Sequence, residues 1–172
     1  ESAPEPGLLR LLSDLYSEAG KVDRALEAAR HAAELEPGQI DLWLNLVFRS
    51  LAAQQPGEAL RAASKAVELD THSALAWLAS AAAHAACEKW TQALSDIEHV
   101  IRLVEPWVNE NRLLSDLRSL RTGYLLRVEG VDAALAQVTA DLELDPDSES
   151  LRELQARLLS LKLGAQFDPP IT

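Results

Sequence analysis

The chain has 172 residues and a formal net charge of −11. This charge repels phosphate, so it argues against nucleic-acid binding and against binding to an anionic membrane surface. The hydrophobic content of 48% excludes a disordered tail, and the single cysteine, Cys87, excludes an internal disulfide bond.

A pair of helices is predicted over residues 6–39, after a short N-terminal extension at residues 1–5. Alanine and leucine dominate the apolar residues, and both fit a helix at little conformational cost. Gly20 marks the bend between the two helices, and Pro37 marks the exit. The first helix has apolar and aromatic residues at helical spacing: Leu9, Leu12 and Tyr16. The second helix has small residues at similar spacing: Ala25, Ala29 and Ala32.

The same pattern recurs every 34 residues, which predicts two further helical pairs over residues 40–73 and 74–106. The large residues Leu9, Trp43 and Trp77 keep this interval, as do the alanines that begin each second helix. We expect the alanines to let antiparallel helices approach closely and the tryptophans to fill the space between pairs. Because one pair cannot bury its apolar face alone, neighbouring pairs must stack.

These residues resemble the tetratricopeptide repeat (TPR) family, whose first-helix pattern is matched by Leu9, Leu12, Ser13 and Tyr16 and again from Trp43 and Trp77. The resemblance covers residues 6–163. It implies an all-α fold, a right-handed α-solenoid or superhelix of about four TPR-like helical hairpins with a C-terminal capping helix. In this family the first helix of each hairpin lines the concave face, where partners usually bind as peptides.

The fourth pair, residues 107–147, departs from the repeat by about seven extra residues before Leu114. Seven residues are about two helical turns, so a lengthened first helix is expected. A capping helix is predicted over residues 148–163, with Asp147 or Ser148 as its N-cap. Residues 164–172, which include two prolines, are predicted to form an extended tail or linker.

A partner-binding groove is predicted on the concave face. Its middle is apolar, which suits an amphipathic helix or an extended apolar segment anchored on Leu44, Phe48 and Leu78. In the alternative interpretation these side chains pack on their own second helices or lie under the chain's own tail. The repeat register predicts these residues for the face: Arg10, Asp14, Ser17, Asp41, Leu44, Asn45, Phe48, Leu51, Leu75, Leu78, Ala79 and Ala82, joined by Arg118, Ser119 and Thr122.

Chaperone-binding relatives hold a terminal carboxylate with Lys and Asn side chains from three hairpins. Here Asn45 fits one place and Arg10 could replace one lysine. Asp14 stands where that clamp has an asparagine, and Leu75 and Ala79 stand where it has basic residues. The clamp is incomplete, which argues against binding of a chaperone tail.

Four arginines, Arg112, Arg118, Arg121 and Arg127, form a basic cluster in the fourth pair. It could contact an anion or an acidic protein, or it could be ordinary helix-surface charge. Trp107 is expected either to pack against the third hairpin or to be partly exposed at an interface.

The chain shows no motif for catalysis, a metal or a cofactor. It lacks a glycine-rich phosphate loop, a G-x-S-x-G elbow, H-E-x-x-H and paired C-x-x-C. His84 and Cys87 could share a helix face, but two ligands do not make a zinc site, and core packing is the preferred interpretation. No apolar run approaches the ~20 residues needed to cross a bilayer, so no direct membrane insertion is expected. We expect a non-enzyme without cofactors.

The predicted function is a protein–protein interaction scaffold within a larger protein or complex. The alternative is a structural spacer or self-association segment, which could form homo-oligomers, in an assembly such as a bacterial polysaccharide-export or pilus-assembly machine. The absence of methionine, even at position 1, suggests a processed or excised piece. A cytoplasmic or a periplasmic location would fit either function.

Overall fold

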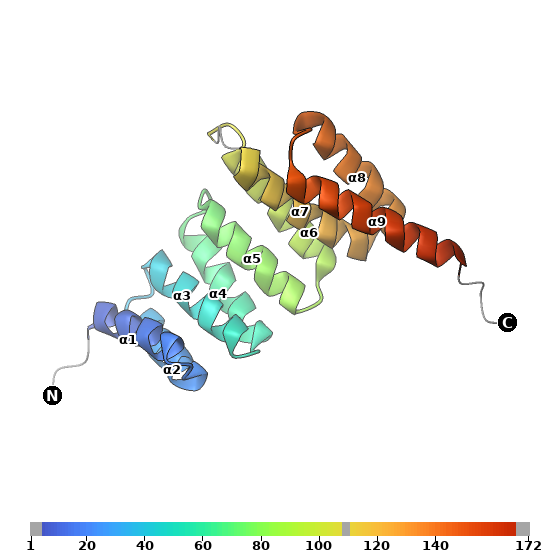
Figure 1. The fold of residues 1–172 in the computed structure, drawn as a ribbon. Helices are drawn as coiled ribbons and strands as arrows, with labels where there is room; N and C mark the ends of the chain where they lie inside the picture. The colour runs from blue at the N-terminus through green and yellow to red at the C-terminus, as the bar shows by residue number, and fades with distance from the viewer. Residues whose placement is uncertain (1–4, 108–110, 168–172) are drawn as a thin grey trace. The chain divides into compact units, whose positions relative to one another are not determined.

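The computed structural model describes residues 5–107 and 111–167, and within these residues the chain forms nine α-helices and no strand (Figure 1). The chain divides into two compact units, residues 1–89 and 90–172. Unit 1 contains α1 (Pro6–Glu18), α2 (Val22–Leu35), α3 (Ile40–Ala52), α4 (Pro56–Leu69) and α5 (Ala74–Ala86). Unit 2 contains α6 (Trp90–Val104), α7 (Asn111–Val128), α8 (Val131–Leu144) and α9 (Glu149–Phe167). The predicted third pair is therefore divided, with α5 in unit 1 and α6 in unit 2.

Unit 1 is built from helical hairpins whose first helices lie side by side. Within it α1 packs on α2 and α3 packs on α4, and α3 also contacts both α1 and α5. Ala25 and Ala59, the alanines that recur at an interval of 34 residues on the second helices, are almost fully buried, as is Ala93 on α6 in unit 2. Their burial agrees with the predicted role, because a small side chain leaves room for a neighbouring helix to approach closely.

The bends that follow α1, α3 and α5 use one backbone conformation at positions 34 residues apart. Gly20 has a φ of 69°, Gln54 a φ of 55° and Glu88 a φ of 58°. This left-handed conformation lets the chain reverse after each first helix. Only the first of the three bends has the glycine that tolerates it without strain.

The tryptophans at the start of α3 and α5 tie each helix to the preceding loop. The indole Nε1 of Trp43 donates to the carbonyl oxygen of Pro37 at 2.8 Å, and that of Trp77 donates to Thr71 at 2.9 Å. Both indoles are half-buried. In unit 2, Arg152 Nε donates to the carbonyl oxygen of Pro146 at 3.0 Å across the same sequence separation. A guanidinium thus replaces the indole at the start of α9.

In unit 2 the helices α6, α7, α8 and α9 pack in sequence, and α7 also contacts α9. Helix α7 has 18 residues, compared with 13 in α1, α3 and α5, as the extra residues predicted. Ser148 is the cap of α9, because its Oγ accepts from the Leu151 amide at 3.3 Å. Helix α9 continues to Phe167, past the predicted end at residue 163, since no proline interrupts it before Pro169. The remainder of the predicted tail, residues 168–172, lies outside the described residues.

Trp107 lies in the turn that follows α6. Its side chain is 85% exposed, so the predicted packing on the third hairpin is wrong and the exposed alternative holds. Among the described helices, none combines the length and the apolar composition required to cross a membrane.

Candidate protein-binding surface

The surface formed by the first helices α1, α3 and α5 of unit 1 carries most of the predicted groove residues. We call this surface the first-helix face. Its α1–α3 half is polar. Asp14 Oδ1 accepts from Asn45 Nδ2 at 2.9 Å and from Arg49 Nη2 at 2.9 Å, and Arg49 also donates to Ser17. Asn45 is therefore engaged by its neighbours. Sequence reasoning missed Arg49, whose contacts with α1 lie outside the apolar pattern.

Arg10 and Asp41 extend this polar half along the same two helices. Arg10 Nη1 lies 4.0 Å from Asp41 Oδ2, and both side chains are well exposed. An exposed ion pair at this distance contributes little to stability. Both side chains are therefore free to reorient toward a bound partner at low cost.

The α3–α5 half of the first-helix face is apolar. Phe48 is 45% exposed and Leu75 is 49% exposed, on neighbouring first helices. Leu51, Leu78 and Ala82, also predicted for the face, are half-buried. Large apolar side chains are thus exposed on two neighbouring first helices, and a single binding surface formed by them stays a prediction.

Leu44 is a correction to the predicted groove. It is only 5% exposed, and it packs within the hydrophobic core of unit 1. Its predicted role as an anchor for a partner is wrong, because its surface is already covered by the chain's own helices. Ala79, also predicted for the face, is buried as well.

The predicted residues of the fourth pair belong to unit 2, and two of them are inaccessible. Thr122 is fully buried and Arg118 is 7% exposed. Arg118 Nη2 donates to Glu105 Oε1 at 3.2 Å, whereas Ser119 is half-buried. The predicted contribution of Arg118 and Thr122 to a binding surface is therefore wrong, because packing within unit 2 covers them.

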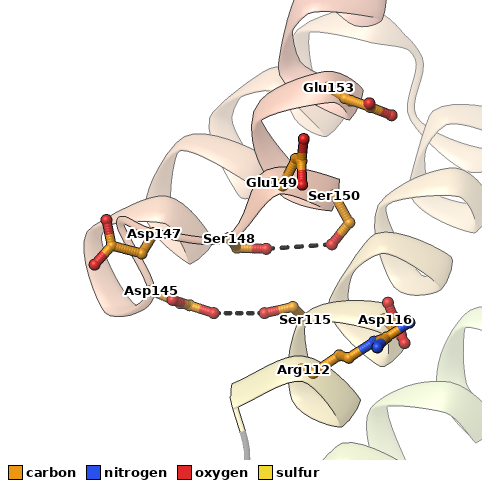
Figure 2. Close-up of a pocket in the computed structure, with 9 residues that line it drawn as sticks. All are labelled: Arg112, Ser115, Asp116, Asp145, Asp147, Ser148, Glu149, Ser150 and Glu153. Atoms are coloured by element: carbon orange, nitrogen blue, oxygen red, sulfur yellow. Dashed lines mark hydrogen bonds between the residues drawn. The ribbon is translucent and has the colours of Figure 1, made fainter.

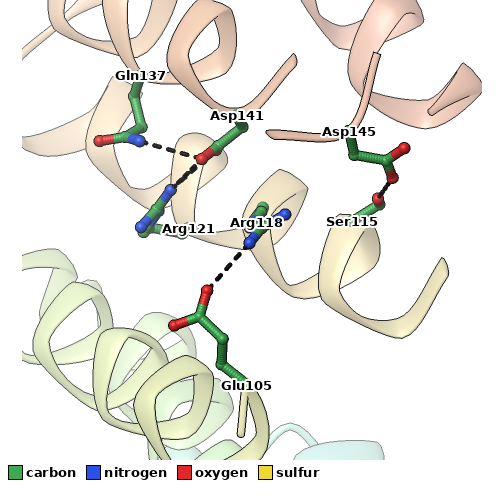
Figure 3. A network of polar contacts seen from close by, with 7 residues as sticks. All are labelled: Glu105, Ser115, Arg118, Arg121, Gln137, Asp141 and Asp145. Atoms are coloured by element: carbon green, nitrogen blue, oxygen red, sulfur yellow. Dashed lines mark hydrogen bonds and ion pairs between the residues drawn. The ribbon is translucent and has the colours of Figure 1, made fainter. Parts of the chain in front are cut away.

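Two arginines of the basic cluster, Arg118 and Arg121, make contacts inside unit 2, whereas Arg112 and Arg127 are exposed (Figure 3). Arg121 Nη2 donates to both carboxylate oxygens of Asp141 at 2.6 and 2.8 Å, and Gln137 donates to the same carboxylate at 3.2 Å. Arg127 lies over the ring of Trp90 at 5.4 Å. For Arg118 and Arg121, both predicted alternatives, a contact with an external anion or acidic protein and ordinary helix-surface charge, are therefore wrong. One signal could have revealed this pairing: Asp141 continues the core-facing spacing of Ala134 and Val138 on α8.

A hollow of about 670 Å³ in unit 2 is lined mainly by carboxylates (Figure 2). Ser115 Oγ donates to Asp145 Oδ2 at 2.6 Å, and this bond joins α7 to the end of α8. The Oγ atoms of Ser148 and Ser150 lie 3.2 Å apart. In the described part of the chain, no group of three His, Cys, Asp or Glu side chains is arranged to hold a metal ion. The lining residues are Arg112, Ser115, Asp116, Asp145, Asp147, Ser148, Glu149, Ser150 and Glu153.

Titratable groups are perturbed by packing between helices. The hydrogen bond from Arg30 lowers the pKa of Glu58 and raises the pKa of Arg30. Burial, followed by the nearby charge of Asp96, raises the pKa of Tyr124. These three residues lie outside the first-helix face, so the shifts report helix packing rather than a reactive site.

No family model and no curated protein matches the chain by sequence, but solved structures match its fold. The thermophilic TPR protein TTC0263 of Thermus thermophilus aligns with a TM-score of 0.66 at 20% identity, over 90% of this chain and 81% of its own. MamA, from residue 41 to its end, of Desulfovibrio magneticus RS-1 aligns with a TM-score of 0.74 at 15% identity, over 94% and 88%. The first TPR of Spaghetti (RPAP3), bound to the HSP90 peptide SRMEEVD, aligns with a TM-score of 0.59 at 24% identity, over 69% and 92%. This likeness confirms the all-α fold of helical hairpins predicted from the repeats.

Proposed function

We propose that this chain, which has the tetratricopeptide-repeat fold, is a non-catalytic scaffold that binds an apolar or amphipathic protein segment on its first-helix face. Folds of this kind are typically used for protein–protein interaction, and the RPAP3 domain was solved with a peptide bound. The observation that carries the proposal is the exposure of Phe48 and Leu75 on the neighbouring helices α3 and α5. Both side chains are already about half buried, so a partner that covers them would gain about 1 kcal/mol for each, roughly half the value for a fully exposed side chain.

The polar half of the face is balanced in charge. Asp14 accepts from Arg49 at 2.9 Å, and Asp41 lies 4.0 Å from Arg10, so each carboxylate has an arginine beside it. This half therefore favours polar flanking residues and gives no strong preference for either sign of charge. Asn45, the one residue that fits the carboxylate clamp of chaperone-binding relatives, is already bonded to Asp14. We therefore propose a partner segment with apolar anchors and polar flanks, and not an acidic chaperone tail.

Peptide display against the chain, followed by fluorescence anisotropy on the enriched peptides, tests this proposal. We expect enrichment of amphipathic sequences with polar flanks, and no binding of SRMEEVD. Phe48→Ala and Leu75→Ala should each weaken binding about tenfold or more. The matched control is Leu144→Ala, which removes an exposed leucine from α8 in unit 2. Equal affinity for wild type, Phe48→Ala and Leu75→Ala would show that this face is not the binding surface.

Self-association is a second candidate, supported by exposed leucines on α9. Leu159, Leu161 and Leu163 are each about half exposed, and Leu161 borders a shallow apolar hollow with Ala156 and Gly164. A spacer that assembles with copies of itself would bury such a surface. Light scattering across a range of concentrations tests this. A constant monomer mass at all concentrations would remove the candidate, and dimerisation abolished by Leu161→Glu would support it.

A further inference from the structure

Helix α1 presents a row of exposed leucines on one side. Leu8, Leu11 and Leu15 are 51%, 54% and 50% exposed, and Leu12 lies between them. Their spacing of i, i+3, i+4 and i+7 places all four on one stripe of the helix. A contiguous apolar stripe of this kind usually marks a contact surface, whereas single exposed leucines need no explanation.

The corresponding positions of the next repeat are covered by neighbouring helices. The positions 34 residues later in α3 are Leu42, Asn45, Leu46 and Arg49. Leu42 and Leu46 are buried, and Asn45 and Arg49 bond to Asp14 of α1. Every member of the α3 stripe is thus buried or bonded, and the two polar members are bonded to the preceding hairpin. The α1 stripe therefore occupies positions that a helical element covers one repeat later.

The second helix continues the same surface. A hollow of about 350 Å³ lies between α1 and α2, and it is bordered by Leu12, Tyr16, Arg24 and Ala28. Arg24 is exposed, whereas its counterpart on α4, Glu58, is half-buried. We call the surface made by the α1 stripe and this hollow the front face of unit 1.

The front face has a positive charge, Arg24, where the next hairpin has a negative one. Position 58, which corresponds to Arg24, is a glutamate, and it accepts two hydrogen bonds from Arg30 of the preceding hairpin at 2.7 and 2.9 Å. Arg24 instead lies over the ring of Tyr16, 5.9 Å from its centroid. In the next hairpin, α2 places Arg30 against Glu58. A helix that covered the front face in the same way would meet Arg24 instead of a glutamate, so it would need a carboxylate at the position of Arg30.

We propose that the front face of unit 1 is a docking surface for a helix of a partner protein. The partner helix presents small and apolar residues to Leu8, Leu11 and Leu15, and it places an Asp or Glu against Arg24. The apolar anchors proposed for the first-helix face, Phe48 and Leu75, lie on α3 and α5, whereas the front face is made by α1 and α2.

Two helix-stapled peptides test the proposal by anisotropy titration. One has the α2 sequence, residues 22–36, and the other has the same sequence with Arg30→Glu. We expect the wild-type chain to prefer the glutamate peptide about tenfold. The chain variant Arg24→Glu should reverse the preference, because it restores the charge found at Glu58. Leu8→Asp should abolish binding of both peptides, and Leu144→Asp in unit 2 should not. Leu8 and Leu144 are both exposed, so each variant should retain the helical circular dichroism of the wild type.

Three results would overturn the proposal. The first is no saturable binding of either peptide to wild type. The second is an unchanged preference in Arg24→Glu. The third is a self-associated wild-type chain that Leu8→Asp converts to monomers, which would assign the front face to a second copy. Phe48→Ala should leave peptide binding here unchanged, so the outcome does not depend on the first-helix face.

Discussion

Arg30 of α2 and Glu58 of α4 form a two-point ion pair that joins successive hairpins of unit 1. Nε donates to Oε1 at 2.7 Å and Nη2 donates to Oε2 at 2.9 Å. The parallel geometry matches the planar guanidinium to the planar carboxylate. The pair links the second helices of two repeats, so it ties hairpin stacking to the charge state of one glutamate.

Glu58→Gln should destabilise unit 1 by about 1 kcal/mol at neutral pH, a modest value because Arg30 is partly exposed to solvent. The bond lowers the folded-state pKa of Glu58 below its ordinary value of 4.5. The pair's contribution is therefore fully present above the unfolded pKa and is lost as the pH falls through the lower folded pKa. Urea unfolding of wild type and Glu58→Gln at pH 7 and pH 3 measures this. The two proteins should differ less at pH 3, and a constant difference would contradict the assigned cause.

Gln54→Gly and Glu88→Gly should each stabilise the chain by about 0.5–1 kcal/mol. Both residues have the left-handed φ that Gly20 adopts at the first bend, and this conformation costs a residue with a side chain about 1–2 kcal/mol. Part of the gain is offset because glycine makes the unfolded chain more flexible. Thermal unfolding checks this, with Gly20→Ala as the control of opposite sign. No atom lies within 4 Å of a Cβ added at Gly20, so any loss there reports backbone strain alone.

Asp141→Ala should destabilise unit 2 by about 3 kcal/mol, because it leaves the guanidinium of Arg121 largely buried without its partner. Asp141 is only 2% exposed and accepts both hydrogen bonds from Arg121. The double variant Arg121→Met/Asp141→Leu should recover most of this loss, because no buried charge remains. Denaturant unfolding of Arg121→Met, Asp141→Leu and the double variant, followed by circular dichroism, gives the coupling between the two positions. If the loss in the double variant equalled the sum of the two single losses, the pair would not be coupled.

Leu44→Ala should lower the free energy of unfolding more than Phe48→Ala, because only Leu44 lies in the core. Leu44 lies in the core of unit 1, so its truncation should cost about 2–4 kcal/mol of unfolding free energy. Phe48 is 45% exposed, so its truncation should cost less than about 1 kcal/mol. Urea midpoints of the two variants measure this. A Phe48→Ala loss as large as that of Leu44→Ala would place Phe48 in the core and weaken its proposed role as an anchor.

Several features were predictable from the sequence because they depend on neighbours along the chain. The 34-residue period predicted the helical pairs, and Gly20 predicted the first bend, since local backbone conformation and helical periodicity are read directly from residue order. Ser148 was one of two expected caps for α9, and its hydroxyl supplies the capping bond. The exposure of Phe48 and Leu75 followed from the repeat register.

The sequence by itself therefore determined the helices, their period and the apolar stripe of each one. Only the tertiary structure decided which stripe residues are covered. Leu44 and Phe48 lie one turn apart on α3, yet one is in the core and the other is exposed. Arg118 and Arg121 become internal because Glu105 and Asp141, which lie on other elements, reach them. Burial and ion pairing depend on groups that are distant in sequence, and a single helix contains no information about which partner will be brought against each of its faces.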